Sequence, residues 1–130
     1  MILQTTLSLS AAAVAINLWL GTRIAAVRNK DKIWHGDGDN PLLMRRMRAQ
    51  ANFIENTPFL LILAAAIELS GAGGTWLWVA GGAYMLARIA HALGMDAATP
   101  NPARGLGFGA GLLVSLGLAA VAVLVAVGRF

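Results

Sequence analysis

Four polar residues recur at helical spacing beside a long apolar stretch of the sequence. They are separated by intervals of three, four and three residues: Arg45, Arg48, Asn52 and Glu55. Residues three and four apart lie on one face of an α-helix, so this spacing predicts a single polar stripe. Two guanidinium groups, an amide and a carboxylate on one stripe are suited to binding a small ligand that carries both negative and positive charges.

A second polar set recurs at intervals of four and three residues: Tyr84, Arg88 and His91. This spacing again predicts one helix face. Two of the three also have a structural interpretation. Tyr84 could bind a ligand, or only satisfy its hydroxyl inside a helix bundle. His91 could be a hydrogen-bonded packing residue, and with no second histidine or cysteine nearby it does not predict a metal site.

The balance of charge favours a ligand site over a salt bridge as the reason for these residues. Glu55 could pair with Arg48 or Arg88 and tie two helices together. However, Arg48, Arg88 and Arg104 outnumber the single carboxylate at this end of the apolar segments. A surplus of cations inside a helix bundle favours an anionic ligand. We therefore expect Glu55 to be the anionic member of a cationic pocket.

The elements that position these residues are apolar segments. The chain has 130 residues, of which 58% are hydrophobic and only 12% charged, which is typical of an integral membrane protein. Asn-Pro pairs and a Gly-rich turn divide it into four predicted helices, over 2–27, 41–69, 75–95 and 103–127. The sequence predicts one all-α domain over 1–130, a four-helix bundle in the membrane.

The distribution of basic residues predicts the topology. Seven of the ten basic residues fall between the first and second apolar segments, from Arg23 to Arg48. The positive-inside rule then places the first and third connections in the cytoplasm and both termini outside. Because the net charge of +4 is explained in this way, we do not expect a nucleic-acid partner. The chain has no cysteine, so any thiol chemistry must use the sulfur of a ligand.

The pattern Arg48-Ala49-Gln50-x-Asn52-x-x-Glu55-x-x-Pro58 resembles the second-helix signature of the MAPEG family, the membrane-associated proteins in eicosanoid and glutathione metabolism. Arg88-x-x-His91 late in the third helix and Arg104 at the start of the fourth support the resemblance. The turn at 35–38 looks like that of the small bacterial members. The resemblance implies a homotrimer in the bacterial inner membrane, with glutathione between adjacent subunits and lipophilic small molecules arriving from the membrane lipids.

The resemblance also implies roles for individual residues. Arg48, Asn52 and Glu55 match positions that contact glutathione, with Glu55 facing its amino group. Arg88 and His91 lie in the corresponding segment of the third helix. Arg104 looks like the arginine that stabilises the glutathione thiolate and is the one expected catalytic residue. Three positions depart from relatives that carry a basic residue, a ligand-binding tyrosine and a serine: Ala51, Met95 and Gly105.

Two functions from different classes follow. The first is a glutathione transferase or peroxidase that acts on lipophilic electrophiles or lipid peroxides. The second is a non-catalytic membrane protein of the same fold that binds a fatty acid, a lipid head group or another anion. A small transporter is less well supported, because the charged residues gather toward one side and do not run through the midplane of all the helices.

Overall fold

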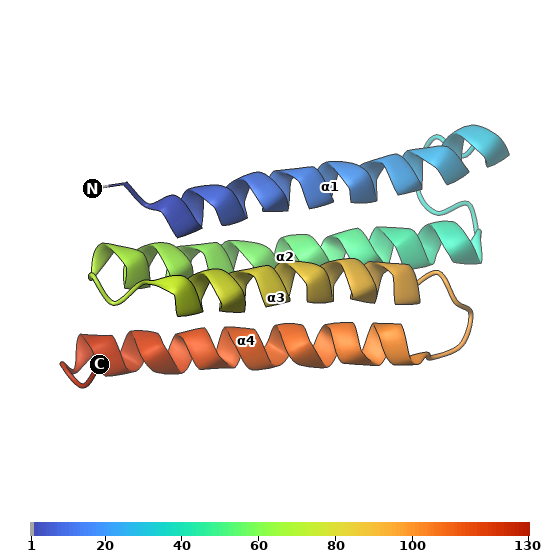
Figure 1. The fold of residues 1–130 in the computed structure, drawn as a ribbon. Helices are drawn as coiled ribbons and strands as arrows, with labels where there is room; N and C mark the ends of the chain where they lie inside the picture. Colours follow the sequence, from blue (N-terminus) through green and yellow to red (C-terminus); the bar gives the residue numbers. More distant parts are fainter. Residues whose placement is uncertain (1) are drawn as a thin grey trace.

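Four α-helices run antiparallel to one another in chain order (Figure 1). The computed structural model describes residues 2–130, and these contain no strand. The helices are α1 (Gln4–Asp31), α2 (Pro41–Leu69), α3 (Thr75–Gly94) and α4 (Pro102–Ala126). The two termini lie at the same end as the turn between α2 and α3, and the other two connections lie at the opposite end (Figure 1). The all-α bundle predicted from the sequence is confirmed.

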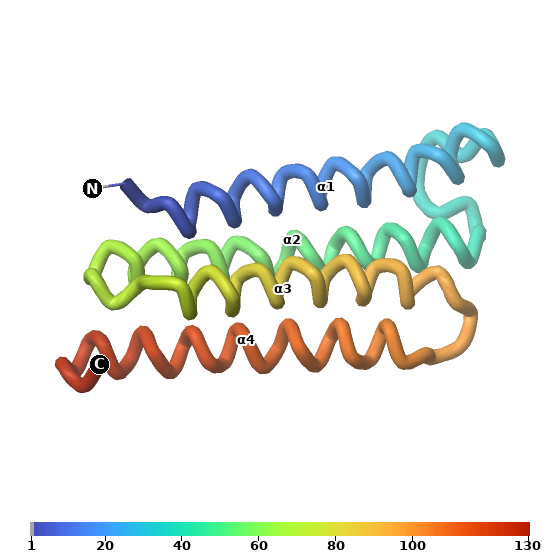
Figure 2. The backbone as a smooth tube through the Cα atoms, viewed as in Figure 1, coloured from blue at the N-terminus to red at the C-terminus, as the bar shows by residue number. Residues whose placement is uncertain are grey.

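The four helices do not contribute equally to the core. The tube in Figure 2 shows α2 and α3 between the two outer helices. The helix α1 packs against α2 and α3, and α4 packs against α3 and α2, whereas α1 and α4 do not touch. The largest fully buried apolar side chains come from all the helices except α1: Leu43, Leu60, Ile67, Leu77, Tyr84 and Leu118. Because lipid tails are as apolar as these side chains, close packing and van der Waals contact, more than removal from water, hold the helices together in a membrane.

Two helices begin at an asparagine followed by proline, as expected from the sequence. The Asn40 side chain accepts a hydrogen bond from the backbone N–H of Leu43 at 3.0 Å, and Asn101 accepts one from Arg104 at 3.0 Å. Proline then occupies the first turn of each helix, where its missing N–H costs nothing. The second of these caps fixes the position of Arg104 at the beginning of α4.

The helix α1 ends one turn later than expected. Its range was predicted as 2–27, but the structure shows Gln4–Asp31. The polar residues after Val27 do not prevent a helix, because arginine, lysine and asparagine all tolerate helical backbone. The helix ends where Lys32 adopts a left-handed conformation with φ 55° and its N–H binds the carbonyl of Arg28. Hydropathy marks where a helix leaves an apolar layer, and not where it ends.

The other end of α1 is capped by a residue from α2. Leu3 precedes the helix and has no side chain that could accept a hydrogen bond. The carboxylate of Glu68 instead accepts hydrogen bonds from the backbone N–H groups of Thr5 and Thr6, at 2.8 and 2.9 Å. It also accepts one from the Thr6 hydroxyl at 2.8 Å. A carboxylate is favoured here because free N–H groups and the helix dipole make this end positive. Glu68 thereby joins α1 to α2.

Three helices are long and apolar enough to cross a membrane: α1, α2 and α4. Four such spans were expected, and α3 is not among those that qualify by length and composition. Its apolar character is reduced by the polar residues of the second predicted set, most of all Arg88 and His91. Its 20 residues nevertheless rise by about 30 Å, and α3 lies beside the other helices in the middle of the bundle. The chain is a membrane helix bundle in which α3 packs against all three other helices.

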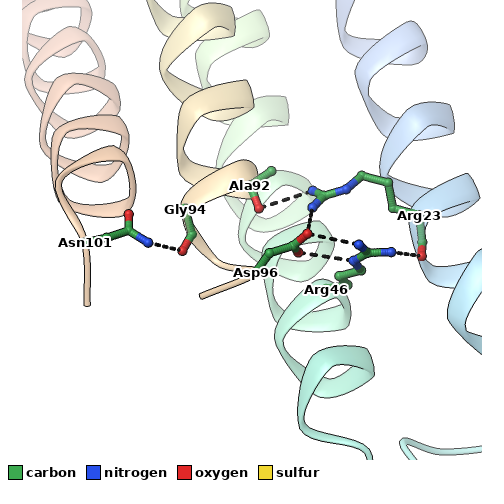
Figure 3. A network of polar contacts seen from close by, with 6 residues as sticks. All are labelled: Arg23, Arg46, Ala92, Gly94, Asp96 and Asn101. Carbon is green, nitrogen blue, oxygen red and sulfur yellow. Dashed lines mark hydrogen bonds and ion pairs between the residues drawn. The ribbon is translucent and has the colours of Figure 1, made fainter. Parts of the chain in front are cut away.

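Ion pairs fasten the connection between α3 and α4 to the rest of the bundle (Figure 3). The carboxylate of Asp96 forms two ion pairs: its Oδ2 lies 2.6 Å from Nη2 of Arg23 on α1 and 3.0 Å from Nη2 of Arg46 on α2. Arg46 also donates to the carbonyl of Arg23 at 2.8 Å, and Arg23 donates to the carbonyl of Ala92 at 3.2 Å. Both ion pairs among residues 2–130 therefore belong to this one network, which holds the loop that leads to Arg104.

The network should make the stability of the bundle depend on pH. Burial raises the pKa of Asp96, but the hydrogen bonds and charges of Arg46 and Arg23 outweigh it and hold that pKa below its ordinary value. The ion pairs therefore stabilise the fold above about pH 4, the ordinary aspartate pKa, and this contribution is lost as the pH falls further. We expect Asp96→Asn to cost about 1 kcal/mol at pH 7.

Thermal unfolding of the native chain and of Asp96→Asn between pH 7 and pH 3 measures this contribution. The difference in melting temperature should be constant above about pH 5 and should shrink below about pH 4. A difference that grows as the pH falls would contradict a stabilising carboxylate at Asp96.

Candidate functional site

A cleft of about 660 Å³ opens at the end of the bundle that carries the α1–α2 and α3–α4 connections. Its lining comes from α2, from the end of α3 and the loop after it, and from the first turns of α4. The lining residues are Met44, Arg45, Arg48, Asn52, His91, Met95, Ala98, Arg104, Gly105 and Phe108. The lining thus combines cations with apolar residues, and the volume is in the usual range of small-molecule sites.

The cleft is strongly cationic. It is lined by three arginines, Arg45, Arg48 and Arg104, and by no carboxylate. None of the three forms an ion pair within the part of the chain that the structure describes, since both pairs there use Asp96. The Nε of Arg45 is buried and has no hydrogen-bond partner among these residues. Uncompensated guanidinium groups with free donors are the arrangement that binds anions.

His91 provides a hydrogen-bond acceptor in the cleft wall. Its Nδ1 lies 3.3 Å from the carbonyl oxygen of Arg104. Because a carbonyl oxygen can only accept, this nitrogen carries the proton, which leaves Nε2 of the neutral ring as an acceptor. The residue is 6% exposed, and its ring lies near that of Phe108, with the ring centroids 6.3 Å apart. The contact also connects α3 directly to the first turn of α4.

The amide of Asn52 is oriented by Arg88. Arg88 donates from Nη1 to Oδ1 of Asn52 at 2.5 Å and from Nη2 to the carbonyl oxygen of Gly107 at 2.9 Å. With its oxygen engaged in this way, Asn52 keeps its two amide N–H groups as donors. Arg88 therefore lies behind the cleft wall and holds a cleft residue in position.

Glycines allow α3 and α4 to approach closely enough to build this wall. A Cβ on Gly107 would lie 2.5 Å from the carbonyl oxygen of Ala87 and from the backbone nitrogen of His91. A Cβ on Gly94 would collide with the backbone of Arg104, and one on Gly111 with the guanidinium of Arg88. A side chain at Gly94 or Gly107 would meet backbone atoms that cannot move aside, so glycine permits the close approach of α3 and α4 that the small residues of the fourth helix predict.

Four of the seven site residues predicted from the sequence line the cleft: Arg48, Asn52, His91 and Arg104. Arg88 does not line it and supports Asn52 instead. Tyr84 is 1% exposed, its hydroxyl lies 3.1 Å from that of Thr57, and the guanidinium of Arg88 lies over its ring. Of the two interpretations of Tyr84, a hydroxyl satisfied inside the bundle describes its place in the fold. A ligand-binding role for these residues stays a prediction.

Glu55 lies one turn beyond Asn52 on α2, is exposed, and lines neither the cleft nor the smaller cavity described below, so its expected role in ligand binding stays a prediction. It forms no ion pair with Arg48 or Arg88, so the proposed salt bridge is absent from residues 2–130. The polar stripe itself is present on α2, but only its first three members reach the cleft.

The sequence prediction missed one polar and several apolar lining residues. Arg45 belongs to the same helical stripe as Arg48, and that spacing alone was a signal for including it in the site. Met95 had a signal in the resemblance, which matches it to a ligand-binding tyrosine of relatives. The other apolar members carried none, because apolar residues are found throughout the chain: Met44, Ala98 and Phe108.

Fold and cleft together define a class of protein: a membrane-embedded α-helical bundle with a cationic cleft at one end. The sequence model of the MAPEG family matches residues 6–124, which is almost the entire chain, and the chain belongs to this family. It is therefore a membrane protein of a family associated with glutathione and eicosanoid metabolism. No curated protein matches the chain.

Proposed function

We propose that the cleft binds glutathione, or a similar anionic thiol, for reaction with lipophilic electrophiles or lipid peroxides. The observation that carries this proposal is the lining of the cleft, which has three arginines without carboxylate partners. Glutathione has two carboxylates and one ammonium group, so several guanidinium groups complement it. Membership of the MAPEG family supports the same ligand class.

The individual residues suit different parts of this ligand. Arg45 and Arg48 supply charge-assisted hydrogen bonds for carboxylates, and the amide of Asn52 supplies further donors. The apolar lining residues, among them Met95 and Phe108, suit the lipophilic second substrate. Since the lining contains no hydroxyl group, activation of the thiol falls to Arg104 and His91.

Arg104 and His91 act on the thiol in different ways. A free thiol has a pKa of about 8.5, and a guanidinium beside the sulfur stabilises the thiolate. Lowering the thiol pKa by about two units corresponds to about 2.7 kcal/mol. The Nε2 of His91, as an acceptor, can take the thiol proton, and the helix dipole at the start of α4 adds positive potential beside Arg104.

The exposed carboxylate of Glu55 supports an assembly of several chains. A charged side chain on a spanning helix costs several kcal/mol when it faces lipid. Two large apolar residues flank it, Ile54 and Phe59, both more than half exposed. A homotrimer that covers this face of α2 places Glu55 at a subunit boundary, where it faces the amino group of glutathione. Native mass spectrometry tests this: monomers that bind glutathione with full affinity would exclude an intersubunit site.

The basic α1–α2 connection also predicts the orientation of the bundle in the membrane. The cleft lies at the end with the basic α1–α2 connection, which the positive-inside rule assigns to the cytoplasm. Glutathione therefore enters from the cytoplasm in a bacterial inner membrane, both termini face outward, and lipophilic substrates enter from the bilayer.

Replacing Arg48 by glutamine should weaken glutathione binding. Loss of a charge-assisted hydrogen bond costs about 1.5 to 3 kcal/mol, or about 10-fold to 100-fold in Kd. Calorimetric titration of the protein in nanodiscs measures the change. The matched control is Lys30→Gln, which removes the same charge from the exposed end of α1 outside the cleft.

The titration also separates the proposal from its alternative. If the native chain binds oleate or glutamate as tightly as glutathione, the cleft is a site for anions in general, as in a non-catalytic protein of the same fold. Equal losses of affinity in Arg48→Gln and Lys30→Gln would show that only the net charge matters, and would contradict a site at Arg48.

A further inference from the structure

A second and smaller cavity lies beside the cleft, between α2, α3 and α4. Its volume is about 80 Å³, and it is lined by Asn56, Arg88, Phe108, Gly111, Leu112 and Ser115. Phe108 borders both cavities, but no other residue is shared. The cavity is therefore distinct from the cleft proposed for glutathione, and too small for a tripeptide.

The guanidinium of Arg88 forms one wall of this cavity and is only partly satisfied. The residue is 4% exposed, and its Nη1 and Nη2 donate to Asn52 and to the carbonyl of Gly107. Its Nε is buried and has no hydrogen-bond partner within residues 2–130. A Cβ on Gly111 would meet Nη2, Cζ and Nε. The unsatisfied edge of the guanidinium thus lies against Gly111, itself part of the cavity wall.

The cavity has a positive charge that no acidic residue balances. Arg88 forms no ion pair, because both ion pairs of the described residues use Asp96. The other polar lining groups are neutral. Ser115 donates its hydroxyl to the carbonyl of Gly111 at 2.9 Å, and Asn56 donates to the carbonyl of Asn52 at 2.7 Å. A buried cation in a membrane helix is costly without an anion nearby.

Shape and size restrict what this anion can be. The Nε–H and the second N–H of Nη2 form the side edge of the guanidinium, and this edge matches the two oxygens of a carboxylate. The volume equals that of about two or three water molecules, which accommodates a carboxylate group. On its outer border, Phe108 and Leu112 are about half exposed, and Leu116 continues the same apolar face of α4.

We propose that this cavity is a carboxylate-binding site, in which the side edge of Arg88 pairs with the carboxylate of a free small acid or of an amphiphile. In the second case the apolar chain lies along Leu112 and Leu116. The site is occupied independently of the glutathione cleft. It supplies the buried Arg88 with the counterion that the chain itself does not provide.

Thermal unfolding of the full chain in nanodiscs of zwitterionic lipid tests the proposal and separates the two sources. Acetate and decanoate are the probes, and decanol is the uncharged control. A saturable rise in melting temperature with decanoate but not acetate identifies an amphiphile, and equal rises identify a free carboxylate. An equal rise with decanol, or no rise with either acid, overturns the proposal.

A cavity-filling variant locates the effect. Ser115→Leu occupies the cavity without touching the cleft, and it should weaken the carboxylate response at least tenfold while the Kd for glutathione stays unchanged. The matched control is Ala120→Leu, which adds the same side chain at an exposed position of α4. If Ser115→Leu does not fold, the smaller Ser115→Val serves instead. A carboxylate response that persists in the filled variant overturns the proposal, whatever glutathione does.

Discussion

Replacing Arg104 by alanine should abolish the thiolate absorbance of bound glutathione. The guanidinium of Arg104 lines the cleft, whereas the backbone contact with His91 uses only its carbonyl oxygen. The substitution therefore removes the charge and leaves intact the hydrogen bond between His91 of α3 and the backbone carbonyl at the start of α4. Without the guanidinium the thiol pKa returns toward about 8.5, and only a few per cent of the thiol ionises at neutral pH.

Difference absorbance of glutathione added to the protein in nanodiscs measures the thiolate directly. We expect a signal at pH 7 for the native chain and a decrease of about tenfold or more for Arg104→Ala, which corresponds to about 1.4 kcal/mol or more. The affinity for glutathione should change less, because Arg45 and Arg48 remain. Saturated binding without a thiolate signal in the native chain would show that the cleft holds the ligand without activating it.

The fold could be predicted well from the sequence because its signals are local. Asn40-Pro41 and Asn101-Pro102 specify helix starts by hydrogen bonds within one turn. The end of α1 could not be predicted in this way, since it depends on the conformation of Lys32 and not on apolar periodicity. The cap that Glu68 supplies to α1 joins residues more than 60 positions apart, and no pattern along the chain indicates it.

The site was predicted only in part, because spacing identifies a helix face but not what that face meets. Arg48 and Asn52 of the α2 stripe and His91 of the α3 set line the cleft. The same spacing grouped Arg88 with them, although its long side chain reaches Gly107 and a second cavity. Glu55 shows the other limit, because it belongs to the same stripe and yet is exposed and lines neither cavity.

Replacing Gly107 by alanine should destabilise the bundle and the cleft together. The new Cβ would lie 2.5 Å from the Ala87 carbonyl oxygen and the His91 nitrogen, and both are backbone atoms that no side-chain rotation can move away. The helices must therefore separate, at a cost of about 1 to 3 kcal/mol for overpacking. Separation also disturbs the contacts of Arg88 with Gly107 and of His91 with Arg104.

A second glycine of α4 provides the matched control. A Cβ on Gly109 meets no atom within 4 Å, so Gly109→Ala should keep or raise the melting temperature through helix propensity, by up to about 1 kcal/mol. Thermal unfolding and glutathione titration of both variants distinguish the effects. Gly107→Ala should lose stability and affinity together, because the same interhelical contact builds the core and the cleft wall. Equal behaviour of the two variants would show that α4 can shift without cost, and that the cleft does not depend on this close approach.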